Sequence, residues 1–184
     1  MKPLDDIISQ EFLPALLGKV VISSASRELY SLPLRHGGLG IPVFCESASK
    51  EYDASTRVTA PLVAIMMMQG RELPNREEII KKRKEVTAEH EERLKNKVVE
   101  VDLALPVETA RRRKQACEKG ASSWLSVLPL SDQGFTLTKG EFRDALALRY
   151  EDSIPDLPSR CPCGDTFNMT RIELQARWLH NHAS

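Results

Sequence analysis

Two cysteines and two histidines near the end of the chain have the types and spacing that could bind a metal ion. Cys161 and Cys163 form a Cys-x-Cys pair, and His180 and His182 follow as a His-x-His pair. A structural Zn²⁺ needs about four ligands, usually thiolates and imidazoles in tetrahedral geometry. Histidines two positions apart in a helix point to nearly opposite sides, so both could reach one ion only if the last helical turn frays. We therefore expect no resident cofactor, with zinc at these four residues as the alternative.

A thiol nucleophile is the second chemistry that the residue types could support. Cys45 or Cys163 could act as the nucleophile, and His36 or His90 as its base. A catalytic thiol needs a base within hydrogen-bond reach, and nothing in the spacing of these residues places a histidine beside either cysteine. We therefore expect no enzymatic activity and no small-molecule substrate.

Several cations could contact phosphate groups of RNA or DNA. The candidates are Arg35, Arg111, Arg112, Arg113, Lys114 and Lys119. Each phosphate contact adds to a salt-dependent affinity, although four adjacent cations are equally typical of a solvated helix face. The whole chain carries 26 basic and 26 acidic residues, so no global field attracts it to nucleic acid or to an anionic membrane. Any binding of RNA or DNA is expected to be local and weak.

Length and composition limit the class of protein. A chain of 184 residues can form one core, or two small units joined by a linker. No apolar run approaches the length of a bilayer span, and charges rather than a signal-peptide core follow Met1. The four cysteines are too unevenly spaced for a disulfide scaffold. We therefore expect an intracellular protein with reduced thiols and no membrane partner.

The first 72 residues have helical periodicity interrupted by special residues. Apolar residues recur at helical spacing between residues 3 and 18, where Pro14 predicts a kink or two short helices. Ser23 or Ser24 can cap an open amide and begin a short helix. Three glycines within residues 37–40 predict a tight turn that packs on a neighbouring helix.

A second helical region covers residues 43–68, and Pro61 is expected to begin a new helix there because proline is tolerated in a first turn. Asn75 and Glu78 then have capping-box spacing, and charges of both signs crowd residues 76–100. Such a helix cannot bury much surface, so residues 73–105 are predicted to form a charged helical linker and a domain boundary.

The third region begins at Pro106, which is expected to end the preceding helix. Residues 107–118 are predicted to form a helix. Thr138 and Glu141 again have capping-box spacing, so another helix should begin near Lys139, with Arg143 facing water.

Five sequence blocks occur in an order that matches a known arrangement. They read LPLRHGGLGI at 32–41, VTAPLV at 58–63, KGASSWL at 119–125, GEFRDAL at 140–146 and CPCG at 161–164. Together they resemble the region downstream of the reverse transcriptase in polyproteins of animal retrotransposons that lack long terminal repeats, over most of residues 3–169. The resemblance implies a thumb end, a helical connector, the opening of a zinc-knuckle-like finger and a nuclear location.

The chain departs from this family in three ways. Asp5 and Asp6 lie in a thumb-like helix rather than on the strand hairpin of a polymerase, so the polymerase centre is absent. No nuclease segment follows, and the His-Ala-Leu-x-Cys continuation of the finger does not appear after Thr170. We hypothesise that a frameshift produced the tail from about Arg171.

The sequence therefore predicts a mainly α chain with four parts. These are a thumb-like helical segment with a Gly-rich turn at 1–72, a charged helical linker at 73–105, a small helical unit at 106–160, and an incomplete knuckle with a frameshifted tail at 161–184. The expected function is that of a non-catalytic fragment of a retrotransposon polyprotein with at most residual nucleic-acid binding. The alternative is a helical zinc-binding or protein-interaction module that uses Cys161 and Cys163 with His180 and His182.

Overall fold

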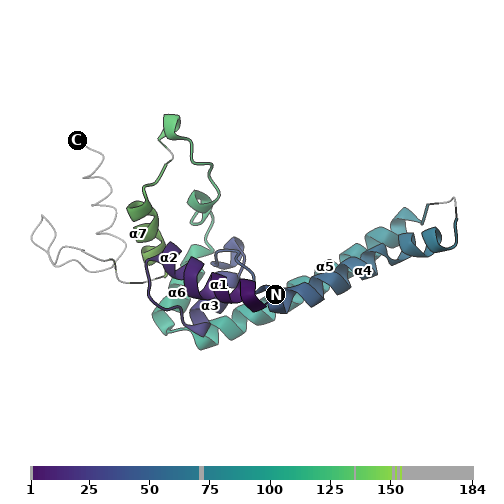
Figure 1. Cartoon of the computed structure of the whole chain (residues 1–184), viewed down its shortest axis with the longest axis horizontal. Coiled ribbons are helices and arrows are strands. Elements are labelled where there is room, and N and C mark those ends of the chain that lie inside the picture. The colour runs from purple at the N-terminus through teal and green to yellow at the C-terminus, as the bar shows by residue number, and fades with distance from the viewer. Residues whose placement is uncertain (1, 71–72, 135, 151, 153, 155–184) are drawn as a thin grey trace, which may run out of the picture.

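The protein consists of a small helical body and a long two-helix arm (Figure 1). The computed structural model describes residues 2–70, 73–134, 136–150, 152 and 154. Helices account for most of these residues and no strand occurs among them, so the prediction of a mainly α fold is confirmed. The α-helices are α1 (Lys2–Ile7), α2 (Leu13–Leu17), α3 (Ser24–Ser31), α4 (Phe44–Met67), α5 (Arg76–Ala104), α6 (Val107–Ala116) and α7 (Lys139–Tyr150). The described helices include none that is both long and apolar enough to cross a membrane.

The first helical segment changes its winding before Pro14. A π-helical stretch, Ile8–Phe12, joins α1 to α2 without a break. Proline has no N–H to donate and its ring crowds the preceding turn, so a local change in winding lets the helix continue past it. Gly18, in the left-handed conformation with φ of 69°, ends the segment.

Local caps fix the starts of two further helices as the sequence predicts. The Ser23 hydroxyl accepts a bond from the Ser26 amide at the start of α3. At α7 the capping box is complete, because the Thr138 amide donates to Glu141 and the Glu141 amide donates to the Thr138 hydroxyl. These caps satisfy amides that have no partner within the helix.

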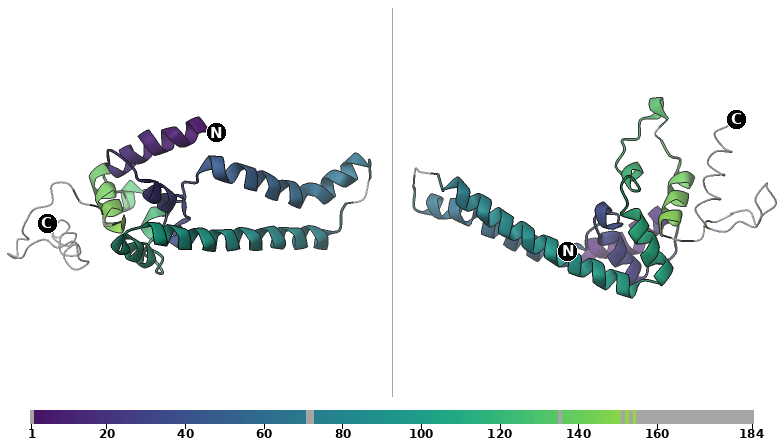
Figure 2. Two further views of the ribbon diagram at one scale, coloured as in Figure 1. Left: turned by 90° about the horizontal axis from the view of Figure 1, so that it is seen from below. Right: turned by 180° about the vertical axis from the view of Figure 1, so that it is seen from behind.

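The arm is an antiparallel pair of helices, α4 and α5, that extends away from the body (Figure 2). At 29 residues, α5 is about 43 Å long. Its start is capped by the Asn75 side chain, which accepts a bond from the Glu77 amide.

Pro61 does not begin a new helix, contrary to the sequence prediction. It lies inside α4, which runs unbroken from Phe44 to Met67. The missing N–H costs one helical hydrogen bond. The packing of α4 on α5 favours the continuous helix: one turn before Pro61, Arg57 pairs with Glu89 of α5 at 2.6 Å.

The core lies in the body, around the residues with the least exposed surface. Its main members are Leu13, Leu17, Leu29, Tyr30, Leu32, Leu94, Val101, Leu105, Leu146 and Tyr150. The rings of Tyr30 and Tyr150 meet edge to face, 5.0 Å apart. The core thus joins residues from both sides of segment 73–105, and the last turns of α5 are part of it.

Contrary to the sequence prediction, Arg143 does not face water. It is half-buried, and its guanidinium donates to the backbone carbonyl of Ala15 in α2. The neighbouring Phe142 packs edge to face against Trp124, with ring centroids 5.7 Å apart. Long side chains such as that of Arg143 can cover apolar surface while their polar tip stays hydrogen-bonded. Through Arg143 and Phe142, α7 therefore contacts both α2 and the segment that contains Trp124.

Candidate functional site

The predicted metal ligands Cys161, Cys163, His180 and His182 lie outside the described residues. Within the part of the chain that the structure describes, no group of three or more His, Cys, Asp or Glu side chains could hold a metal ion. The zinc site therefore stays a prediction from the sequence.

Arg113, the third of the four adjacent cations, is buried rather than solvated. Its guanidinium pairs with both carboxylate oxygens of Asp102 in α5, at 2.8 Å for the Nη2–Oδ2 contact. A third bond, of 3.1 Å, goes to the backbone carbonyl of His36. This fork-to-carboxylate pair, with its further bond to His36, joins α5 and α6 to the 3-10 turn that precedes the glycines.

The other predicted phosphate ligands are less buried than Arg113. Arg35 is exposed and pairs with Glu91 of α5. Arg111 and Lys114 are exposed at the surface of α6, with carboxylate contacts of only 3.7 Å to Glu108 and 4.0 Å to Asp102. The half-buried Arg112 contacts Gln115 at 3.5 Å, and Lys119 is exposed in the turn after α6. Arg111, Lys114 and Lys119 are thus the most accessible of the predicted set.

The Gly-rich turn is held by arginines from three different helices. Besides Arg113 of α6, Arg149 of α7 donates to the Gly38 carbonyl at 3.3 Å. Arg27 of α3 donates to the carbonyls of Ile41 and Pro42, each at 2.8 Å. All three arginines are buried. Buried backbone carbonyls outside helices and strands have no partner in a regular hydrogen-bond pattern, so they need other donors. The three arginines supply these donors.

The close approach at this turn explains its glycines. A Cβ on Gly38 would lie 1.9 Å from the Leu32 carbonyl oxygen, and one on Gly37 would lie 2.7 Å from the Arg113 carbonyl oxygen. Gly37 also has a φ of 83°, which disfavours other residues. The prediction that the turn packs against a neighbouring helix is confirmed, and that helix is α6.

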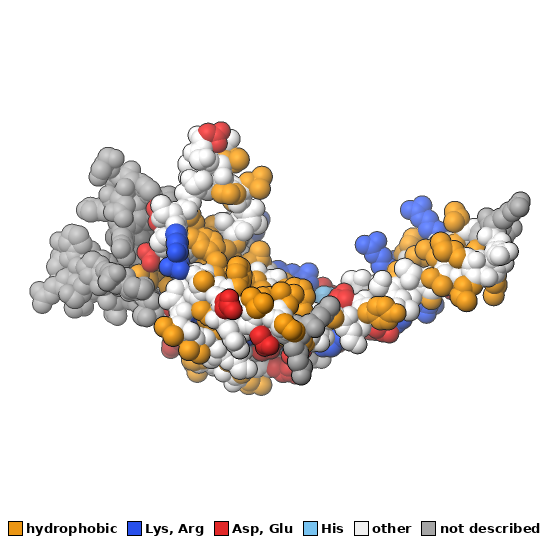
Figure 3. Space-filling view, viewed as in Figure 1, with side chains coloured by type: hydrophobic (Ala, Val, Ile, Leu, Met, Phe, Trp, Pro, Cys, Tyr) orange, Lys and Arg blue, Asp and Glu red, His pale blue; other side chains and the backbone are white. Residues whose placement is uncertain are grey.

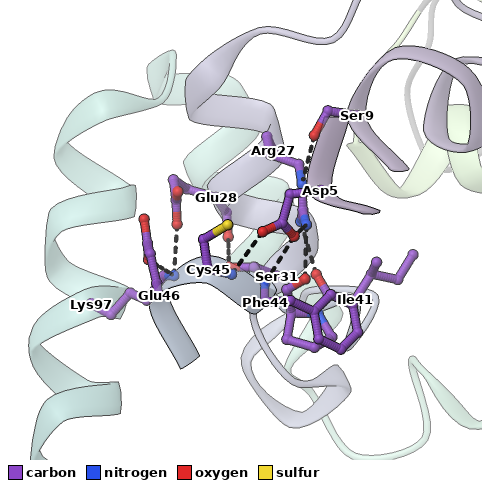
Figure 4. A network of polar contacts seen from close by, with 11 residues as sticks. Asp5, Ser9, Arg27, Glu28, Ser31, Ile41, Phe44, Cys45, Glu46 and Lys97 are labelled. Atoms are coloured by element: carbon purple, nitrogen blue, oxygen red, sulfur yellow. Dashed lines mark hydrogen bonds and ion pairs between the residues drawn. The ribbon is translucent and has the colours of Figure 1, made fainter. Parts of the chain in front are cut away.

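A second polar network lies where α1, α3 and α4 meet (Figure 4). The residue before α4, Val43, has no side chain that could cap it. Asp5 of α1 supplies the cap instead, accepting bonds from the amides of Phe44 and Cys45 at 2.8 and 2.7 Å. The Cys45 thiol, with these two amides, holds the pKa of the Asp5 carboxyl below its usual value of 3.8. A carboxylate at a helix N-terminus also complements the helix dipole.

The residues considered for thiol catalysis occupy separate elements. Cys45 lies at the start of α4 beside Asp5, and His90 is exposed in α5. His36 ends a 3-10 turn, Leu34–His36, and burial together with the nearby Arg35 lowers the pKa of its imidazole. A lowered pKa keeps this imidazole neutral at physiological pH.

A cluster that the sequence analysis missed lies on the distal half of α5. Arg76, Lys81, Arg83 and Lys84 are exposed, and none of the four forms an ion pair with another described residue. Ile79, Lys82 and Val86, which are less exposed, lie toward α4. Lys81 and Lys84 lie on the side of α5 away from α4, with the exposed Glu77 between them around the helix, and Arg76 and Arg83 lie on one flank of that side. We call these four cations the basic edge. The sequence alone does not separate these four cations from the other charged residues of α5, because their exposure depends on which side of α5 packs against α4.

Charge is divided along the length of the arm. Among the described residues, the distal half, 54–70 and 73–88, has six cations and three carboxylates, whereas the basal segments 44–53 and 89–104 have four cations and eight carboxylates. The tip is thus positive and the base is negative. In Figure 3 blue cationic side chains lie beside hydrophobic ones toward the far end of the arm.

Comparison of the chain with models of known protein families, with curated proteins and with solved structures finds no match. The resemblance to retrotransposon polyproteins stays a hypothesis based on the five sequence blocks.

Proposed function

We propose that this chain is a non-catalytic helical segment of a retrotransposon reverse transcriptase polyprotein, acting in the nucleus, and that it binds RNA or DNA. The observation that supports binding is the basic edge, where four exposed cations on a projecting helix have no carboxylate partner in the described structure. Cations that are not neutralised within the protein are the ones available to phosphates.

The dimensions of the basic edge suit a short stretch of phosphate backbone. Arg76 and Lys84 are eight residues apart, or about 12 Å along α5. Successive phosphates of one B-DNA strand advance about 3.4 Å along the duplex axis, so this length spans three or four of them.

The exposed cations of α6 offer a second, weaker contact. Arg111 and Lys114 are one turn apart and Lys119 follows in the next loop. Their long contacts to Glu108 and Asp102 leave part of each charge available to a phosphate. We place the main contact on the basic edge because Arg111 and Lys114 each have a carboxylate within 4.0 Å, whereas the cations of the basic edge form no ion pair with another described residue.

Binding to labelled single-stranded RNA and DNA, measured by fluorescence anisotropy at several salt concentrations, tests the proposal. Four phosphate contacts should give a slope of log affinity against log salt of about −3. Replacing Lys81 and Lys84 by Gln should reduce this slope to about half. The matched control replaces Lys50 and Lys95, exposed lysines at the base of the arm, and should leave it almost unchanged. No affinity at low salt would refute the binding role.

A further inference from the structure

The outer face of α4, turned away from α5, carries an uncharged seam. Its members are Ser49, Tyr52, Thr56, Thr59, Val63 and Met66, separated alternately by three and four residues. This is the 3.5-residue spacing with which helices pack side by side in coiled coils. All six residues are exposed, including Tyr52 at 77% and Met66 at 72%. The seam is thus an exposed stripe without charge along one face of α4.

The chemistry of the seam also favours packing over solvation. The Thr56 hydroxyl donates to the Tyr52 carbonyl at 2.9 Å, and the Thr59 hydroxyl donates to the Ser55 carbonyl at 2.9 Å. Because these hydroxyls are satisfied by their own helix, burying them does not leave a donor without a partner. The charged residues of α4, by contrast, lie off the seam.

The order of side-chain sizes along the seam suits an antiparallel copy of itself. With Thr56 on the two-fold axis, Tyr52 of one chain faces Ala60 of the other, and Val63 faces Ser49. Each larger side chain then meets a smaller one, as close packing between helices requires. A parallel arrangement would instead place Tyr52 on Tyr52 and Met66 on Met66.

The division of charge along the arm favours the same orientation. An antiparallel pair brings the positive tip of each arm beside the negative base of the other, whereas a parallel pair opposes like charges. Exposed apolar residues lie at both ends that would meet. Val63, Met66 and Met67 are near the tip, and Leu4 and Ile7 belong to α1, which caps the start of α4 at the base.

We infer that the occupant of this face is a second copy of the chain, docked antiparallel through α4 with Thr56 on the two-fold axis. The two arms then form a four-helix bundle with α4 helices at its centre. The seam from Ser49 to Met66 is about 26 Å long. The basic edge, on the opposite side of each arm, stays exposed, so this inference is independent of the proposed function.

Mass measurement by analytical ultracentrifugation over a range of protein concentrations tests the dimer. Thr56→Glu puts two carboxylates face to face at the axis and should weaken dimerisation by about tenfold or more. Thr87→Glu is the matched control, because Thr87 is also exposed and its hydroxyl also donates to its own helix, at Arg83, 2.8 Å away. This variant should dimerise as the parent does, and circular dichroism checks that both variants stay helical.

Disulfide trapping tests the register. In a chain whose native cysteines are replaced by Ser, Thr56→Cys should cross-link to itself under oxidation, whereas Val63→Cys should not. Val63→Cys should instead cross-link to Ser49→Cys when the two variants are mixed. A monomeric mass at every concentration, equal weakening by both glutamate variants, or self-linking at Val63 as strong as at Thr56 would overturn the inference.

Discussion

The body and the arm of this protein are stabilised in different ways. The body buries apolar side chains around Tyr30 and Tyr150 and satisfies an irregular turn with buried arginines. The arm has almost no interior, because no residue of α4 is buried and α5 contributes buried residues only near its base. The arm depends on helix caps, on ion pairs and on half-buried contacts between its two helices. The same kind of substitution should therefore have large effects in the body and small ones in the arm.

The largest effect is expected at the Gly-rich turn. Gly38→Ala places a methyl group against the Leu32 carbonyl, because a Cβ at this position would lie only 1.9 Å from the carbonyl oxygen. Since backbone on both sides must move, we expect a loss of more than about 3 kcal/mol in unfolding free energy, or failure to fold. Gly40→Ala is the control, because Gly40 has a positive φ but open space around it, and it should cost about 1 kcal/mol. Urea denaturation followed by circular dichroism measures both.

Arg113→Met should have the next largest effect. It leaves the half-buried Asp102 carboxylate without its main partner and the His36 carbonyl without a donor. Removing one partner of a buried ion pair costs about 3 kcal/mol. Arg111→Met, an exposed neighbour in the same helix, should change the unfolding free energy by less than about 0.5 kcal/mol. Equal losses for the two variants would show that Arg113 does not join the helices as described.

Asp5→Ala removes the cap that α1 provides to the arm, at the boundary of the two regions. Loss of a cap typically costs about 1 kcal/mol, whereas Asp6→Ala, an exposed control in the same turn, should cost little. The pH dependence gives a second readout. Because the folded pKa of Asp5 lies below its usual 3.8, its contribution is complete above that pH and is lost as the pH falls further. The variant should lack this part of acid destabilisation in pH-dependent thermal melts.

Arg57→Gln in the arm should have the smallest effect. Its bonds to Glu89, at 2.6 and 2.8 Å, are short but lie in water, where solvent and salt screen the attraction. We expect a lower melting temperature at low salt and almost no difference at high salt. A loss comparable to that of Arg113→Met would mean that the arm is more tightly packed than the exposure of its side chains indicates.

The local features of the fold were predictable from the sequence because their partners lie within one helical turn. The serine cap of α3 and the capping box of α7 involve residues three positions apart, and such spacing is read without knowledge of the fold. The mainly α class follows from the same periodicity. The continuation of α4 through Pro61 was not predictable, because it depends on the packing of α4 against α5, a helix that is distant in the sequence.

The candidate sites depended more on tertiary structure. The run of four cations indicates a basic surface, but residues far apart in the sequence decide that Arg113 is buried on Asp102 and His36. The same holds for the basic edge, since only the pairing of α4 with α5 determines which cations of α5 face outward. The sequence by itself determined where α3 and α7 begin and which residues could carry charge. The tertiary structure decided which charges are buried and which remain exposed, because burial depends on the elements that pack together.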